Sequence, residues 1–257
     1  MTRLATEELR AGYGGRGVLD GLDVRIPDGE LTVIVGPNAC GKSTLLRALS
    51  RLLPATGGRV LLDGGDITRL STKEVARRMG LLPQSPLAPE GITVADLVGR
   101  GRYPHQSVLS SWSAEDERAV AEAMAATNVT DLAERNVDEL SGGQRQRAWI
   151  AMALAQETPI LLLDEPTTFL DIGHQIEVLE LVTRLHQEGR TVVVVLHDIN
   201  QAARYASHLI AMKDGRIVAE GAPRDIVDAR LLTELFDLKA RVIADPDTGA
   251  PVVLPGR

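Results

Sequence analysis

Hydrophobic residues in this chain gather in short continuous runs and do not alternate with polar residues. Four such runs cover residues 31–35, 160–163, 191–196 and 208–212. A run of this length without alternation is typical of a strand buried on both faces, as in a parallel sheet with helices on either side. Residues with helical patterns lie between the runs. The chain is therefore predicted to have an α/β fold with a parallel sheet.

Two helices are expected between the apolar runs, and the residues that would end them help to place them. One is expected over residues 42–53, because Pro54 cannot continue a helix. Another is expected over residues 175–188, where apolar residues form a stripe on one face and Gly189 suits the position after the last turn.

The pattern changes over residues 91–138, where strand-like runs disappear and helix-forming residues dominate. Ser113 is a good N-cap, three acidic residues follow it in the first turn, and an alanine-rich stretch runs to Thr127. This segment is predicted to be a helical insert in the α/β core. In the tail, residues 241–254 hold two apolar runs around Asp-Pro-Asp-Thr-Gly, which predicts a small terminal hairpin.

The composition narrows the classes of protein to consider. Of the 257 residues 44% are hydrophobic, and the net charge of −7 argues against a protein that binds nucleic acid through its phosphates. Aromatic residues are only 3%, too few for a surface that stacks bases. No apolar run approaches the roughly 18 residues of a membrane-spanning helix, and the first residues do not resemble a signal peptide. The single cysteine, Cys40, cannot pair within the chain, which fits a reducing, cytosolic location.

The strongest chemical motif is GPNACGKST at residues 36–44, which fits the pattern G-x-x-x-x-G-K-[ST]. It follows an apolar run and opens a predicted helix, so its backbone amides and the helix N-terminus would surround a phosphate group. Lys42 is expected to contact the β- and γ-phosphates, and the Ser43 hydroxyl is expected to ligate Mg²⁺. A glycine-rich turn without function is the alternative. The predicted ATP-binding residues here are Gly36, Pro37, Asn38, Ala39, Cys40, Gly41, Lys42, Ser43 and Thr44.

A pair of carboxylates ends the apolar run 160–163. Asp164 is expected to hold Mg²⁺ through a water molecule, and Glu165 is expected to polarise the attacking water. The alternative is a pair of surface acids at a strand end. That alternative is weak, because an aliphatic strand followed by Asp-Glu-Pro directs both groups to the carboxyl edge of the sheet, where ligands bind.

The sequence LSGGQ at residues 140–144 completes the set, with 164 − 141 = 23 residues from Ser141 to Asp164. With these three motifs the chain resembles an ABC-type ATPase, the nucleotide-binding subunit of a transporter, over essentially its whole length. The resemblance implies a P-loop NTPase (RecA-like) core with a parallel sheet, an N-terminal antiparallel β subdomain and a helical insert. It also implies that a helix over residues 142–155 faces the ATP bound by a partner subunit. The residues of that contact are Ser141, Gly142, Gly143 and Gln144.

The same resemblance implies one nucleotide-binding domain over residues 1–257. Its catalytic core would comprise residues 1–90 and 156–230. Its helical subdomain, with the LSGGQ motif, would comprise residues 91–155. A C-terminal hairpin extension would comprise residues 231–257.

Four further positions match the family by order and surroundings. Tyr13 would stack on adenine, or else be an aromatic residue at a sheet edge. Gln84 would touch Mg²⁺ and link the core to the insert, or else be a polar loop residue. Asp171 would contact the opposite subunit, or else cap a helix, and His197 would contact the γ-phosphate, or else be structural. The implied catalytic residues are Glu165, His197, Lys42 and Gln84, and the implied metal ligands are Ser43, Gln84 and Asp164.

The phosphate loop departs from the family at its fourth position, where Ala39 replaces the usual glycine. If this position needs a positive φ, alanine costs about 1 kcal/mol, a cost that we expect the loop to tolerate. Cys40 lies inside the loop, so alkylation of its thiol is expected to block nucleotide binding.

Residues 94–112 and 165–182 closely resemble ATPases that import ferric siderophores of the citrate, enterobactin and hydroxamate type. Arg100, Arg102 and His105 are expected to form a polar, partly basic lip that meets a partner loop, with a solvated loop as the alternative. The resemblance implies a homodimer with two membrane permease subunits and, indirectly, a substrate-binding lipoprotein, at the cytoplasmic face of the cell membrane. Haem or cobalamin import, and a soluble ATPase of the iron–sulfur cluster assembly type, are the alternatives.

Overall fold

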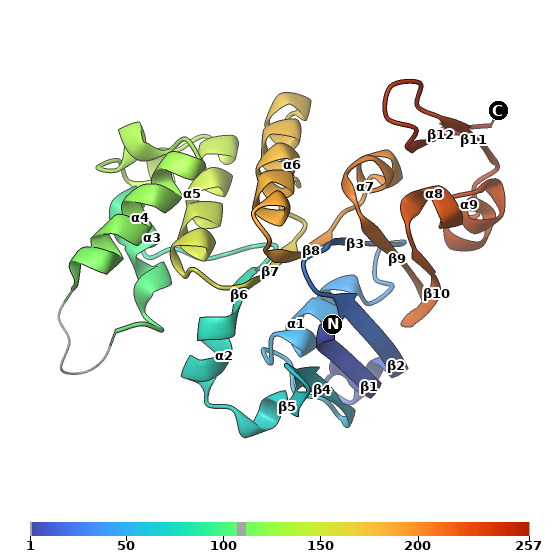
Figure 1. Ribbon diagram of the computed structural model, residues 1–257, viewed down its shortest axis with the longest axis horizontal. Helices are drawn as coiled ribbons and strands as arrows, with labels where there is room; N and C mark the ends of the chain where they lie inside the picture. The colour runs from blue at the N-terminus through green and yellow to red at the C-terminus, as the bar shows by residue number, and fades with distance from the viewer. Residues whose placement is uncertain (1, 107–111, 257) are drawn as a thin grey trace. The chain divides into compact units, whose positions relative to one another are not determined.

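The computed structural model describes residues 2–106 and 112–256, and these form two compact units (Figure 1). The first unit comprises Met1–Leu70 and His186–Arg257, and the second comprises Ser71–Leu185. The boundaries differ from those of the segments predicted from the sequence, and the assignment of functional roles to those segments stays a prediction.

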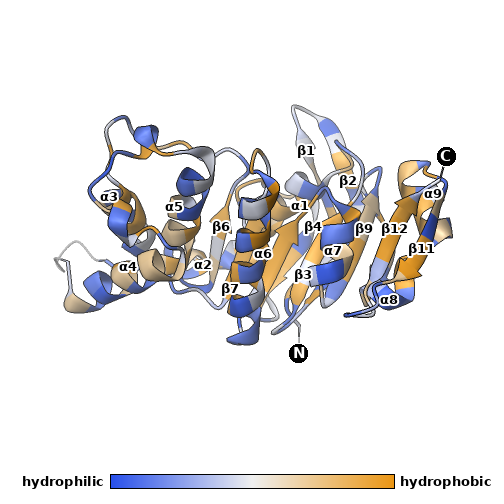
Figure 2. Cartoon of the chain, turned by 90° about the horizontal axis from the view of Figure 1, so that it is seen from above, coloured by the Kyte–Doolittle hydropathy of each residue, from blue (hydrophilic) through white to orange (hydrophobic). Residues whose placement is uncertain are grey.

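The first unit contains four strands that place the longest apolar runs side by side. They are β3 (Leu31–Val35), β8 (Thr191–Val195), β9 (His208–Lys213) and β10 (Arg216–Gly221), in the order β10-β9-β3-β8. The strand β3 is parallel to both β8 and β9, and β10 is antiparallel to β9. Every residue of β3 and β8 is buried, as the continuous apolar runs predict. In Figure 2 the hydrophobic colour lies on β3 and β9.

An antiparallel sheet in the same unit follows the order β2-β1-β4-β5. Its strands are β1 (Thr2–Tyr13), β2 (Arg16–Pro27), β4 (Gly57–Leu62) and β5 (Gly65–Asp66). The long strands β1 and β2 bury one face only, and bulges interrupt their register. This sheet is the N-terminal antiparallel β subdomain that the family resemblance implies.

Short helices and a terminal hairpin complete the first unit. They are α1 (Lys42–Leu49), η1 (Ile67–Arg69), α7 (Ile199–Tyr205), α8 (Pro223–Ile226), α9 (Ala229–Phe236), β11 (Ala240–Ala244) and β12 (Pro251–Pro255). The strands β11 and β12 pair as the hairpin predicted from the tail. The prediction for the first helix was wrong at its end. The helix stops at Leu49 instead of residue 53, because Arg51 takes the left-handed φ of 60°, which no helix continues through.

The second unit is mostly helical. The strands β6 (Met79–Leu82) and β7 (Ile160–Asp164) are parallel neighbours in it. Its helices are α2 (Thr72–Arg78), α3 (Val94–Gly99), η2 (Arg100–Arg102), α4 (Ala114–Ala126), η3 (Thr130–Leu132), η4 (Val137–Glu139) and α5 (Gly142–Ala155), and α6 (Ile172–Gln187) begins in it. Ser113 caps α4 as predicted, and a capping box with Asp116 completes that helix end. None of the described helices is long and apolar enough to cross a membrane.

Candidate nucleotide site

The phosphate loop joins β3 to α1 in the first unit, and two of its glycines are required by the backbone. Gly36 has a φ of 155°, and a Cβ atom there would lie 2.0 Å from the carbonyl oxygen of Met212. Gly41 has a φ of 108° and forms the N-cap of α1. Larger residues are strained or excluded at both positions, so only glycine allows the loop to follow this path into the start of α1, whose N-terminal amides suit an anion.

Lys42 lies inside this loop and does not extend into solvent. It is buried, and its Nζ donates to the carbonyl oxygens of Gly36 and Pro37, each at 2.9 Å. Ser43 follows in the first turn of α1 and is half-buried, and Thr44 is buried. The loop therefore holds a positive charge at its centre, an arrangement suited to an anion with several oxygens.

Ala39 takes a φ of 61°, so the residue that replaces the usual glycine lies in the left-handed region. The strain of about 1 kcal/mol considered from the sequence therefore applies. The adjacent Cys40 is only 4% exposed, and its Sγ lies 4.0 Å from the Lys42 Nζ. Burial raises the pKa of the Cys40 thiol, and the nearby Lys42 charge opposes this only in part.

Cys40 provides a direct test of the loop. We expect N-ethylmaleimide to modify it slowly, because the thiol is buried and its pKa is raised. A modified thiol has no space beside Gly36 and Lys42, so the fraction of chains that bind nucleotide should fall in proportion to the modified fraction. Mass spectrometry and binding of a fluorescent ATP analogue would measure both quantities, with Cys40→Ser as the insensitive control. A fully modified chain with unchanged affinity would contradict the expectation.

Two other predicted residues belong to the first unit. Tyr13 ends β1 and is partly exposed, and its hydroxyl accepts a hydrogen bond of 3.3 Å from Arg47 of α1. His197 is exposed just beyond the carboxyl end of β8. Because β8 and β3 are parallel neighbours, His197 emerges from the same sheet edge as the phosphate loop. This placement supports a shared site for His197 and the loop.

The carboxylates of the second unit lie at the end of β7. Asp164 and Glu165 are both buried, and Glu165 has a φ of 53°. The amide of Gln84 donates to Glu165 Oε2 at 2.5 Å, and the Thr168 hydroxyl donates to the same oxygen at 3.2 Å. The structure thus brings together Gln84 and Glu165, which are 81 positions apart in the sequence. An oriented, buried carboxylate of this kind can act as a base toward water.

The LSGGQ motif forms the start of α5, which spans Gly142–Ala155 as predicted. Ser141 Oγ accepts from the backbone N–H of Gln144 at 3.3 Å, and the Gln144 side chain accepts from the backbone N–H of Ser141 at 3.1 Å. Ser141 and Gly142 are exposed, while Gly143 is buried. This capping box fixes an exposed helix N-terminus, whose positive end suits an anion.

Asp171 caps α6, the structural role weighed as the alternative for it. Its Oδ1 accepts from the backbone N–H of His174 at 3.0 Å, so α6 begins at Ile172 instead of residue 175. Its Oδ2 lies 2.8 Å from His174 Nδ1. The pKa of the Asp171 carboxyl is held below its usual range. The main cause is the hydrogen bond from the backbone of His174, and the next is the one from its ring. His174 was not predicted from the sequence. It lies three positions after Asp171, a spacing at which a capping carboxylate can contact the first turn of a helix, and this was the available signal.

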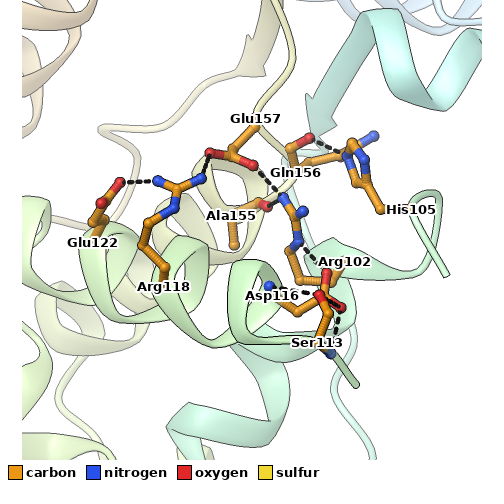
Figure 3. Close-up of polar contacts among 9 residues, drawn as sticks. All are labelled: Arg102, His105, Ser113, Asp116, Arg118, Glu122, Ala155, Gln156 and Glu157. Carbon is orange, nitrogen blue, oxygen red and sulfur yellow. Dashed lines mark hydrogen bonds and ion pairs between the residues drawn. The ribbon is translucent and has the colours of Figure 1, made fainter. Parts of the chain in front are cut away.

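The prediction of a basic lip from Arg100, Arg102 and His105 was wrong for Arg102. Arg100 is exposed and His105 is half-buried, but Arg102 is only 2% exposed. Its Nε pairs with Asp116 at 2.8 Å, and its Nη1 pairs with Glu157 at 2.7 Å (Figure 3). A guanidinium in this position is neutralised within the fold and does not face a partner. Residues 107–111 of the stretch singled out from the sequence lie outside the described residues.

The Arg102 side chain also anchors the end of α5. Its Nη1 donates to the carbonyl oxygen of Ala155, the last residue of that helix, at 2.8 Å. The hydrogen bond from Arg102 holds the pKa of the Asp116 carboxyl low, despite its burial. Arg118 also pairs with Glu157, at 2.9 Å. Figure 3 shows Arg102 between the start of α4 and the residues that follow α5.

The predicted metal ligands have the chemistry that Mg²⁺ prefers. Ser43, Gln84 and Asp164 offer a hydroxyl, an amide and a carboxylate, all with oxygen donors. Magnesium in phosphate sites is commonly held by one or two carboxylates together with the phosphates of the substrate. The chemistry of each of these donors therefore suits this ion.

Comparisons with known proteins bear on these features. A family model described as ABC transporter matches residues 19–168. The chain is 58% identical over 256 residues to the ferric enterobactin transport ATP-binding protein FepC of Escherichia coli (strain K12), with 99% of this chain and 94% of the relative covered. It is 47% identical over 255 residues to the iron(3+)-hydroxamate import ATP-binding protein FhuC of Bacillus subtilis (strain 168), with 99% and 95% covered. A bacterial ABC transporter cassette, solved as a dimer, matches with a TM-score of 0.76 and 31% identity over 85% of this chain and 98% of that one.

Proposed function

The chain belongs to the ABC transporter family, as one of its ATP-hydrolysing cassettes, and from this membership we propose that it energises the import of ferric siderophores. The observation that supports the cargo is the near full-length identity of 58% to a ferric enterobactin transport ATP-binding protein. The relative that imports iron(3+)-hydroxamates supports the same class of iron chelate. Haem and cobalamin stay as alternative cargoes for the test.

The residues take distinct roles in this proposal. Lys42 contacts the β- and γ-phosphates, because its ammonium is fixed at the centre of the phosphate loop. Glu165 accepts a proton from the attacking water, held in place by Gln84 and Thr168. His197 contacts the γ-phosphate from the strand beside the loop. Tyr13 stacks on adenine.

Magnesium would be held by Ser43, Asp164 and Gln84 together with the phosphates of ATP. When bound, the ion neutralises charge that develops on the phosphates during transfer. The contribution of the chain is to present oxygen ligands at the start of α1 and at the end of β7.

The proposed assembly has two copies of this chain and two membrane permease subunits, at the cytoplasmic face of the cell membrane. The capped and exposed start of α5 supports the pairing, since Ser141 offers a helix N-terminus that could meet the ATP of a second copy. Asp171 would contact that copy. A substrate-binding lipoprotein would act indirectly, through the permease.

Uptake of iron chelates in a strain that lacks the gene tests the cargo. The strain would be complemented with wild type, with Glu165→Gln, or with Glu180→Gln, an exposed acid on α6 that serves as the matched control. We expect wild type and Glu180→Gln to restore uptake of radiolabelled ferric siderophores and Glu165→Gln to fail. Restored uptake of haem or cobalamin alone would reject the siderophore proposal.

A further inference from the structure

The second glycine of LSGGQ has a neighbour that explains why a side chain is absent there. A Cβ atom on Gly143 would lie 2.9 Å from Cδ2 and 3.0 Å from Cγ of His174. Real Cβ atoms do not approach other atoms so closely, so the imidazole ring lies directly against the backbone of Gly143. The start of α5 and the first turn of α6 are therefore in contact through this ring.

The ring is held from its other side by Asp171. The carboxylate binds both the backbone N–H and the Nδ1 of His174, at 3.0 and 2.8 Å. Because Nδ1–H donates to a carboxylate, the hydrogen bond is charge-assisted and orients the ring. Asp171 itself belongs to the loop that precedes α6, so the loop, the ring and Gly143 form a continuous chain of contacts.

A second contact keeps α5 and α6 in register. Arg147 Nη1 pairs with Glu177 at 2.9 Å, one turn further along both helices. The contact between Gly143 and His174 is thus supported by an ion pair on the next turn.

We propose that His174 is a positioning residue that fixes the LSGGQ turn relative to the loop carrying Asp171. Its ring sets how closely the two segments approach, and Asp171 sets the orientation of the ring. In the proposed function, the LSGGQ turn and the loop that carries Asp171 both contact a second copy. The ring would keep the spacing between them constant when that copy binds. His174 touches no phosphate in this proposal, and its effect is exerted through Gly143.

The inference rests on the proposed function, and the experiment separates the two. ATP-dependent dimerisation would be measured by analytical ultracentrifugation in the Glu165→Gln background. Nucleotide affinity of the monomer would be measured with a fluorescent ATP analogue, and thermal unfolding would be recorded. If the Glu165→Gln chain forms no ATP-dependent dimer, the proposed function fails. If it dimerises and His174 variants dimerise equally well, only the present inference fails.

We expect His174→Ala to weaken dimerisation about tenfold and to leave monomer nucleotide affinity and the unfolding temperature unchanged. His174→Asn should restore dimerisation, because its amide nitrogen and oxygen occupy the places of Nδ1 and Cδ2. Glu180→Ala, an exposed change on the same helix, is the control.

A double-substitution cycle makes the test specific. Asp171→Ala removes both the orientation of the ring and the direct contact of Asp171 with the second copy, so adding His174→Ala to it should weaken dimerisation no further. Additive losses would overturn the inference, as would parallel losses of unfolding temperature and nucleotide affinity in His174→Ala and His174→Asn. Should His174→Ala fail to fold, His174→Leu replaces it in the cycle, because leucine fills part of the volume of the ring but cannot donate to Asp171: additive losses reject the inference and non-additive losses support it.

Discussion

Replacing Glu165 by Gln is expected to lower ATP turnover by at least about a hundredfold while nucleotide binding stays intact. The hydrogen bonds from Gln84 and Thr168 both go to the Oε2 atom of Glu165. A glutamine can offer its single amide oxygen at this position and keep both bonds. The substitution therefore removes the basic carboxylate and leaves the local geometry in place.

The ATP-bound state should accumulate as a consequence. Release of phosphate would measure turnover, and analytical ultracentrifugation with ATP would measure the dimer, which is expected to be stable in Glu165→Gln and transient in wild type. Glu180→Gln makes the same chemical change at an exposed position and should match wild type in both assays. A monomeric, fully active Glu165→Gln chain would reject both the assigned base and the two-copy model.

Replacing Arg102 by Met is expected to destabilise the fold by about 3–5 kcal/mol. Asp116 is buried beside the guanidinium and would become an uncompensated charge, while the carbonyl oxygen of Ala155 would lose a donor. Methionine fills part of the volume, so the loss is mainly electrostatic. For a chain of this size, the unfolding temperature should fall by roughly 6–20 °C.

Arg118→Met provides the matched control, because Arg118 pairs with Glu122 and Glu157 at the surface. Exposed ion pairs contribute about 1 kcal/mol or less, so the unfolding temperature should hardly change. Thermal unfolding followed by circular dichroism would measure both variants. Equal shifts for the two substitutions would show that burial of the Arg102 pair does not determine its contribution.

The parallel strands could be predicted because their signal is local. Each is a continuous apolar run, and β3 and β8 are buried along their whole length. The strands β1 and β2 gave no comparable signal. Bulges shift their register, and Glu8 takes a φ of 44° within β1, so apolar and polar residues do not alternate regularly.

The candidate site likewise contains parts that could be predicted from the sequence and contacts that could not. The phosphate loop and the start of α5 were predicted because each motif is contiguous in the sequence and contains its own backbone requirements, as at Gly36. Arg102 was placed at the surface because arginines are mostly exposed. Its partners are 14 and 55 positions away, and no local pattern announces them. The contact of His174 with Gly143 also depends on packing between two helices.

The placement of Arg102 has a consequence for changing which permease this chain serves. Arg100 and Tyr103 are exposed on either side of the buried Arg102, so both can be changed without removing the contacts that Arg102 makes within the fold. A library that randomises Arg100 and Tyr103 while keeping Arg102 should yield folded ATPases with altered partner choice.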